Sequence, residues 1–148
     1  MECCPTEFNS NSEKETIDFG EYFASLLKQG SVIALSGGLG AGKTCFVKGI
    51  ALALSIPEII TSPTYTIINE YKGILKGSPV LLCHIDAYRL AGDEDFNSTG
   101  AQEYFYGNNI VIIEWSESIP NSIPAGAITV SIEITGPQSR FFQIKDKQ

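Results

Sequence analysis

Continuous apolar runs alternate along the chain with longer stretches whose apolar positions follow a helical spacing. Residues 32–35 and 110–113 contain no polar side chain, which is typical of strands buried on both faces of a sheet. Residues 16–27 place most of their apolar side chains on one helical face, and residues 44–54 form a second helical stretch that ends before Pro57. The pattern therefore predicts strands and helices in alternation.

The middle of the chain predicts two strands joined by a turn. Residues 64–71 are rich in β-branched and aromatic side chains, which favour a strand. Residues 72–79 contain two glycines and a proline, so they predict a turn into a further strand at residues 80–85.

The C-terminal part predicts one short helix and two more strands. Residues 93–105 are typical of a short helix, interrupted by Gly100. Residues 128–134 alternate between apolar and polar positions, which predicts an antiparallel or edge strand. Residues 141–144 are the expected pairing partner of that strand.

Helices that alternate with buried strands predict one three-layer α/β domain. We expect a central, mostly parallel sheet with a region of antiparallel strands. Residues 1–14 are rich in Asn, Ser and Glu and are expected to form a flexible tail. Residues 15–148 then form the single domain.

Charge and composition narrow the class of protein. The chain has 10 basic and 17 acidic residues and a net charge of −7, so it has no general attraction for nucleic-acid phosphates, and a role on RNA would need a basic partner. Its apolar runs are far too short to span a membrane. The polar N-terminus does not resemble a secretory signal, and the four cysteines form no metal-binding pair. We therefore expect reduced thiols and a cytoplasmic location.

A glycine-rich loop separates the first apolar run from the following helix. Gly37, Gly42, Lys43 and Thr44 match the G-x-x-x-x-G-K-[ST] pattern of a phosphate-binding loop. Glycines reach backbone angles that let successive N–H groups point at phosphate oxygens, and the helix N-terminus adds its dipole. The lysine would reach the β- and γ-phosphates, and the threonine hydroxyl would ligate Mg²⁺. The strand before the loop and the helix after it predict that the chain binds a nucleoside triphosphate.

Two acidic residues end predicted strands. Asp86 follows the run LLCHI, and Glu114 follows the run IVII. Because the carboxyl ends of parallel strands meet at one edge of a sheet, we expect both acids beside the glycine-rich loop. Acids at that edge hold Mg²⁺ or orient water, so the pair predicts a Mg-dependent NTPase.

Ser62, Pro63 and Thr64 lie between the loop helix and the next strand, where switch segments sit in many nucleotide-binding proteins. Hydroxyl groups at this place could sense the γ-phosphate or its metal. A proline turn with hydroxyl-to-backbone hydrogen bonds explains the same residues equally well. Spacing alone leaves both interpretations open.

Five segments occur together in the order and spacing of one bacterial family: GGLGAGKT, TSPTYTIINEY, HIDAYRL, GAQEYF and VIIEW. Over about residues 16–120 the chain resembles the TsaE family, the small ATPases required for threonylcarbamoyl modification of tRNA. The loop is shared by many families, whereas the later segments are far more discriminating. The resemblance implies a P-loop NTPase-like fold, ATP with Mg²⁺, and weak intrinsic hydrolysis.

The resemblance also implies action on a larger complex. The expected partners are two paralogous subunits of the sugar-kinase fold, which transfer a threonylcarbamoyl group to the adenosine beside the anticodon of tRNA. The ATPase binds these subunits and supports their repeated turnover. Contact with tRNA is expected mainly through the partners, and no membrane is involved.

Roles implied by the resemblance fall on matching positions of this chain. Lys43, Asp86 and Glu114 are the implied catalytic residues, and Thr44 joins the two acids as an implied metal ligand. The implied nucleotide-binding positions of the loop are Gly37, Gly38, Leu39, Gly40, Ala41, Gly42, Lys43, Thr44 and Cys45.

Other implied positions surround the loop, and two loop residues depart from the family pattern. Trp115 is expected close to the nucleotide site, and Thr16 and Arg140 are expected near the base. Gly38 stands where the family usually has an acidic residue, and Cys45 stands where threonine is common. Neither departure removes a phosphate or metal contact.

Three further residues match the segment HIDAYRL. His84 is interpreted either as a packed strand histidine with a satisfied hydrogen bond or as a functional group. Tyr88 and Arg89 either anchor the segment to the sheet or face the partner proteins.

Two other functions remain as alternatives. A small-molecule kinase usually carries several cationic clamps for phosphoryl transfer, yet this chain has only Arg89 and Arg140 as arginines. A nucleotide-dependent binding switch of the GTPase type would need a guanine-reading N-K-x-D stretch, which the sequence lacks.

Overall fold

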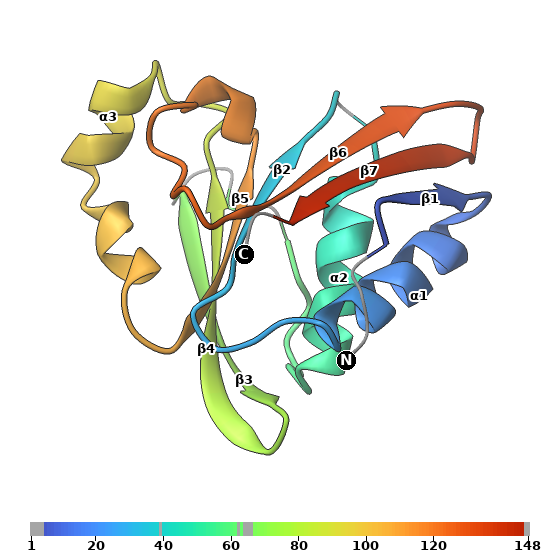
Figure 1. Ribbon diagram of the computed structural model, residues 1–148, viewed down its shortest axis with the longest axis horizontal. Helices are drawn as coiled ribbons and strands as arrows, with labels where there is room; N and C mark the ends of the chain where they lie inside the picture. Colours follow the sequence, from blue (N-terminus) through green and yellow to red (C-terminus); the bar gives the residue numbers. More distant parts are fainter. Residues whose placement is uncertain (1–4, 39, 62, 64–66, 147–148) are drawn as a thin grey trace.

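The computed structural model describes residues 5–38, 40–61, 63 and 67–146. These residues form a seven-stranded sheet in the order β1-β7-β6-β2-β5-β4-β3 (Figure 1). The helices α1 and α2 pack together on one face, and α3 lies on the other (Figure 1). Two separate clusters of buried side chains, one on each face, fill the space between the layers. The predicted three-layer α/β arrangement is confirmed.

From residue 13 on, the elements follow the predicted order, but the turn expected over residues 72–79 is wrong in its extent, because strands occupy residues 68–75 and 78–86 and leave only residues 76–77 between them. The strands are β1 Glu7–Ser10, β2 Val32–Ser36, β3 Ile68–Leu75, β4 Ser78–Asp86, β5 Asn109–Glu114, β6 Ile128–Ile134 and β7 Arg140–Asp146. The α-helices are α1 Glu13–Ala24, α2 Lys43–Ala53 and α3 Asp93–Ser98, and short 3₁₀ helices span Ala101–Phe105 and Ser116–Ser118. The predicted interruption at Gly100 is confirmed, because this glycine adopts a left-handed conformation (φ 76°) between α3 and the first 3₁₀ helix.

The centre of the sheet is parallel and its margins are antiparallel. β2 pairs in parallel with β5 and β6, and β4 pairs in parallel with β5. β3 is antiparallel to β4, β7 to β6, and β1 to β7. The predicted antiparallel pairing of residues 128–134 with residues 141–144 is therefore confirmed.

The expectation that residues 128–134 could form an edge strand is wrong. β6 is an interior strand, because β2 pairs with one side of it and β7 with the other. Its polar alternation has another cause: Thr129, Ser131 and Glu133 lie on a face of β6 that stays half-buried or exposed.

The N-terminal segment differs from the flexible tail expected over residues 1–14. Residues 7–10 form β1 on the edge of the sheet, and α1 begins at Glu13, with the Ser12 hydroxyl accepting a hydrogen bond from the backbone N–H of Glu15. Phe8 stacks on Phe19 of α1 with ring centres 4.1 Å apart. This aromatic contact and the free edge of β7 order a segment whose composition is mostly polar.

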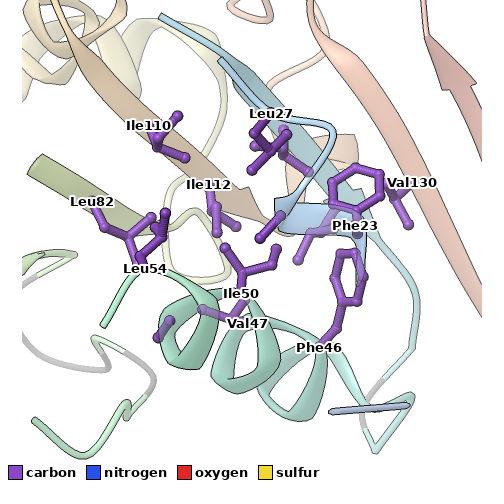
Figure 2. Packing of buried hydrophobic residues seen from close by; sticks show 14 of the residues in the cluster. Phe23, Leu27, Phe46, Val47, Ile50, Leu54, Leu82, Ile110, Ile112 and Val130 are labelled. Atoms are coloured by element: carbon purple, nitrogen blue, oxygen red, sulfur yellow. The ribbon is translucent and has the colours of Figure 1, made fainter. Parts of the chain in front are cut away.

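The larger core cluster lies between the sheet and the helices α1 and α2. Figure 2 shows α2 directing Phe46, Val47 and Ile50 toward the sheet residues Leu82 and Ile112. All five side chains are fully buried. This packing fixes α2, and with it the loop that precedes α2, against the parallel strands.

α1 and α2 cross at a pair of glycines. A Cβ atom placed on Gly49 would lie 2.9 Å from the Cα of Gly20, and one placed on Gly20 would lie 3.0 Å from the Cα of Gly49. Both distances are shorter than ordinary van der Waals contact. The absence of side chains at these two positions therefore sets the separation of the helices.

Replacement of Gly49 by alanine tests this close approach. Alanine normally stabilises a helix interior by up to about 1 kcal/mol over glycine, but here its methyl group would meet backbone, and overpacking typically costs about 1–3 kcal/mol. We therefore expect Gly49→Ala to lower the free energy of unfolding, measured by urea denaturation. Gly126→Ala is the control, because its Cβ would meet no described atom within 4 Å. A rise in stability of Gly49→Ala would contradict the account.

Candidate functional site

Two acids and the glycine loop, residues 37–44, meet at one edge of the sheet. Asp86 ends β4 and Glu114 ends β5, and the two residues are direct neighbours in the parallel register. β2 ends beside them at Ser36 and leads into the loop. Both acids therefore lie beside the loop, as we expected from the sequence.

A cavity of about 670 Å³ opens at this edge. It is lined by Glu13, Thr16, Gly40, Ala41, Gly42, Lys43, Thr44, Cys45, Asp86, Tyr88, Glu114, Trp115, Pro137, Gln138 and Arg140. Its volume falls in the range of small-molecule and cofactor sites. Most of the residues assigned to the site from the sequence lie in this lining.

Gly37 and Gly42 are two of the loop positions at which the backbone conformation requires glycine. Gly37 has a φ of +150°, and a Cβ there would lie 2.7 Å from the carbonyl oxygen of Ile132. Gly42 precedes α2 in a left-handed conformation with a φ of 96°. These angles turn the chain sharply from β2 into α2, so that the first turn of the helix faces the cavity.

Gly38 has no comparable steric reason to be glycine. A Cβ at this position would meet no described atom within 4 Å, and its φ lies outside the left-handed range. The Cβ atom of a larger residue at this position would therefore meet no steric obstacle among the described residues. Leu39, Ser62 and Thr64, which were also predicted to belong to the site, lie outside the described residues.

The ammonium group of Lys43 lies between the start of the loop and the Trp115 ring. Its Nζ donates a hydrogen bond of 2.6 Å to the carbonyl oxygen of Gly37 and lies 3.5 Å from the centre of the Trp115 ring. The residue is only 6% exposed. Burial lowers the pKa of Lys43, and neighbouring carboxylates, Glu114 foremost, oppose that shift. A phosphate entering the cavity would give this buried cation a stronger partner than the carbonyl and the ring.

Asp86 is held at the strand end by the segment that follows it. The backbone N–H of Tyr88 donates a 2.9 Å hydrogen bond to Oδ1 of Asp86. Burial raises the pKa of the Asp86 carboxyl, and this hydrogen bond is the main effect that opposes the rise. Tyr88 also packs against Trp115, with ring centres 4.9 Å apart. Tyr88 thus anchors the segment locally, while Arg89 is exposed.

Glu114 is almost fully buried and contacts the single histidine of the chain. Oε2 of Glu114 lies 2.6 Å from Nε2 of His84, and the two residues are 2% and 0% exposed. The interpretation of His84 as a packed strand histidine with a hydrogen bond agrees with this contact. Its second ring nitrogen, Nδ1, has no hydrogen-bond partner among the described residues.

Thr16 and Arg140 also line the cavity. The Thr16 hydroxyl lies 2.7 Å from the hydroxyl of Ser10. The Arg140 guanidinium donates hydrogen bonds to carbonyl oxygens of Gly40, Gly136 and Ser139. Both residues therefore line the same cavity as the loop, although they lie far apart in the sequence.

Several lining residues were not foreseen from the sequence. Pro137 and Gln138 lie in the β6–β7 connection, and Glu13 begins α1. Just outside the lining, the carboxylate of Glu117 accepts a 3.3 Å hydrogen bond from the backbone N–H of Gly37. None of these residues belongs to a recognisable motif; only the close approach of distant elements brings them to the loop.

Cys45 and Pro63 were both predicted to belong to the site, but only Cys45 is part of the cavity lining. Cys45 lies in the lining, and its thiol donates to a carboxylate oxygen of Glu13 at 3.8 Å. Burial is the main cause that raises the pKa of this thiol. Pro63 is buried, and its carbonyl oxygen accepts a hydrogen bond from the N–H of Ile67. Ser62 and Thr64, on whose hydroxyl groups the two interpretations of the segment depend, lie outside the described residues, so both interpretations stay open.

The oxygen donors in the cavity fit a hard cation held together with phosphates. Within the described ranges, no three or more His, Cys, Asp or Glu side chains form a cluster able to hold a metal. Thr44, Asp86 and Glu114 nevertheless line one cavity. Mg²⁺ is commonly held by one or two carboxylates plus substrate phosphates rather than by a protein cage, so the donor set suits a metal that enters with a nucleotide.

No helix in the described part of the chain is long and apolar enough to cross a membrane.

Comparisons with known proteins identify the family of the chain. The family model described as "Threonylcarbamoyl adenosine biosynthesis protein TsaE" matches residues 10–142. The tRNA threonylcarbamoyladenosine biosynthesis protein TsaE of Treponema pallidum is 45% identical over 131 residues, which cover 88% of this chain and 93% of that protein. The protein of the same name from Bacillus subtilis is 38% identical over 128 residues, covering 86% of this chain and 77% of the relative.

A solved structure shares the fold. The crystal structure of YdiB from Bacillus subtilis matches with a TM-score of 0.76 and 31% sequence identity, and the match covers 96% of this chain and 85% of that chain. The family match and the relatives each span most of the chain. The chain therefore belongs to the TsaE family of threonylcarbamoyladenosine biosynthesis proteins.

Proposed function

We propose that this chain is a Mg²⁺-dependent ATPase that supports the threonylcarbamoyl modification of tRNA. The observation that carries the proposal is the meeting of Lys43, Asp86 and Glu114 with the glycine loop at one cavity. A loop lysine, a helix start and strand-end carboxylates at one sheet edge are the parts with which P-loop NTPases bind and hydrolyse a nucleotide. Family membership supports the pathway.

In this proposal the glycine loop and Lys43 bind the triphosphate. Lys43 is nearly buried, and within the described part of the chain it contacts two uncharged groups, the carbonyl oxygen of Gly37 and the aromatic face of Trp115. A phosphate places a full negative charge opposite the ammonium group, whereas the carbonyl and the ring offer only partial charge. Phosphate binding therefore releases Lys43 from Gly37 and gives the buried charge a matched partner.

Glu114 is the residue that we assign to the attacking water. It lines the cavity while being only 2% exposed, and in such surroundings electrostatic interactions are stronger than in bulk water. Its carboxylate would accept a hydrogen bond from a water molecule and aim it at the γ-phosphorus. Removing that orienting group would slow hydrolysis without removing the phosphate-binding loop.

Thr44 and Asp86 are the residues that we assign to Mg²⁺, together with phosphate oxygens of the nucleotide. When bound, the metal neutralises charge that develops on the transferred phosphoryl group. The Tyr88 N–H fixes one oxygen of Asp86, and Thr44 is held at the start of α2. Both donors are thus positioned by the backbone rather than by long flexible side chains.

A small-molecule kinase fits the cavity less well. Among the described residues, the lining contains one arginine, Arg140, and its guanidinium is engaged by three backbone carbonyls. Phosphoryl transfer to a second substrate usually relies on more than one cationic clamp. Hydrolysis by an oriented water needs only the acids and the loop.

We propose that hydrolysis acts on a partner complex of two paralogous subunits with the sugar-kinase fold. The chain has a net charge of −7, which opposes direct binding of tRNA. Contact with tRNA therefore falls mainly to the partners. This arrangement explains how a single small domain can serve RNA modification.

Replacement of Lys43 by alanine should weaken ATP binding by about 10- to 100-fold, because hydrogen bonds to charged groups contribute about 1.5–3 kcal/mol. Isothermal titration calorimetry with ATP and Mg²⁺ measures the change. Lys48→Ala is the matched control, since Lys48 is an exposed lysine on the same helix. Equal affinity of wild type and Lys43→Ala would contradict phosphate binding at the loop.

ATP hydrolysis should be slow for the chain alone and rise several-fold when the purified two-subunit transferase is added. Glu114→Gln should lower turnover by about 100-fold or more under both conditions, the usual range for loss of a positioned acid or base, and should retain ATP binding. Phosphate release in steady state measures both effects. Glu133→Gln serves as the control, because Glu133 is exposed on β6.

Efficient phosphoryl transfer to a small acceptor, with no effect of the transferase subunits, would favour the kinase alternative. ATP-dependent binding to those subunits without any hydrolysis would instead favour a binding switch.

A further inference from the structure

His84 is a buried polar residue in the middle of an apolar strand. It lies on β4 between Cys83 and Ile85, all three residues being 0% exposed. Its Nε2 is 2.6 Å from Oε2 of Glu114. His84 is absent from the cavity lining, whereas Glu114 belongs to it. The histidine therefore supports the carboxylate from the side that faces the protein interior.

The strand register explains this placement. His84 and Asp86 lie two residues apart on β4 and so point to the same face of the sheet. Asp86 pairs with Glu114, while His84 pairs with Ile112, two residues earlier on β5. His84 thus lies two residues before the level of Glu114 in the sheet, on the side of the buried core. Glu114 lies between His84 and the cavity.

Packing alone gives no reason for a histidine at this position. Nδ1 of His84 is buried and has no hydrogen-bond partner among the described residues, and an unsatisfied buried polar atom opposes stability. A leucine would fill similar space without that penalty. The contact with Glu114 is the gain that the imidazole offers over an apolar side chain.

Glu114 is held both at its backbone and at its side chain. Its backbone carbonyl oxygen accepts a hydrogen bond from the N–H of Ala87 at 3.0 Å. Its side chain meets His84 through Oε2. An ionised carboxylate only accepts hydrogen bonds, so Nε2 of the imidazole is the donor. Together these contacts limit the directions in which the carboxylate can face the cavity.

We propose that His84 is a positioning residue for Glu114: its Nε2–H fixes the carboxylate in the orientation that hydrolysis requires. The inference rests on the proposed ATPase function. His84 touches neither the nucleotide nor the water, and acts only through Glu114. Partners of this kind typically change activity by about 10- to 100-fold when they are removed from a metal-dependent site.

Two substitutions separate positioning from packing. His84→Leu removes the donor and keeps a comparable volume, whereas His84→Gln keeps an N–H donor at a similar reach. We expect His84→Leu to lower kcat by about 10-fold or more with KM for ATP changed less than about two-fold, and His84→Gln to recover most of the loss. If kcat of His84→Leu equals that of wild type, or if His84→Gln is as slow as His84→Leu, the inference is overturned.

A double mutant tests whether His84 acts through Glu114. In a Glu114→Gln background, His84→Leu should cause little further loss of kcat, because the group that it positions has already been changed. Full additivity of the two losses would overturn the inference. Wild type that fails to hydrolyse ATP even with the transferase subunits would overturn the proposed function as well, so the two failures differ.

NMR detects the contact between His84 and Glu114 directly. The measurement requires neither ATPase activity nor a folded His84→Leu variant. The chain contains one histidine, so labelling with ¹⁵N-histidine gives a single imidazole to follow. We expect a protonated, hydrogen-bonded Nε2 in wild type and a clear shift of that signal in Glu114→Gln. The exposed-site variant Glu133→Gln should leave the signal unchanged. An imidazole signal that is the same in wild type and Glu114→Gln would overturn the contact, and with it the inference.

Discussion

The in-register parallel pairing of β4 with β5 is the constraint that builds the site. It places Asp86 directly beside Glu114, and β2, on the other side of β5, brings the glycine loop to the same edge. Because side chains alternate between faces, a slip of one residue would turn an acid away from the cavity. The buried apolar residues that fix the register are therefore as necessary to the site as the polar ones.

The site holds two ionisable side chains that are almost fully buried. Lys43 and Glu114 are both nearly buried at the cavity, and each is held by a nearby partner: a backbone carbonyl for the lysine and an imidazole for the carboxylate. Such placement opposes stability, since buried charges need compensation. The same burial strengthens the electrostatic interactions of these side chains with a ligand bound in the cavity. The polar groups at this edge are better explained by binding and chemistry than by the stability of the fold.

The local parts of the site could be predicted from the sequence, and the long-range parts could not. The loop and the two acids follow from short patterns in which strand, glycine turn and helix are adjacent in the chain. β1 was missed because its order depends on Phe8 meeting Phe19 and on a free sheet edge. The contact of Gly20 with Gly49, and the placement of Gln138 at the cavity, likewise depend on elements distant in sequence. Periodicity carries no information about such pairings.

A crystal structure with Mg²⁺ and a non-hydrolysable ATP analogue tests the central claim most directly. The account predicts phosphates cradled by the glycine loop, with Nζ of Lys43 moved from the Gly37 carbonyl to a phosphate oxygen and with both strand-end acids facing the γ-phosphate. A nucleotide bound elsewhere, or bound while Lys43 keeps its hydrogen bond to Gly37, would contradict it.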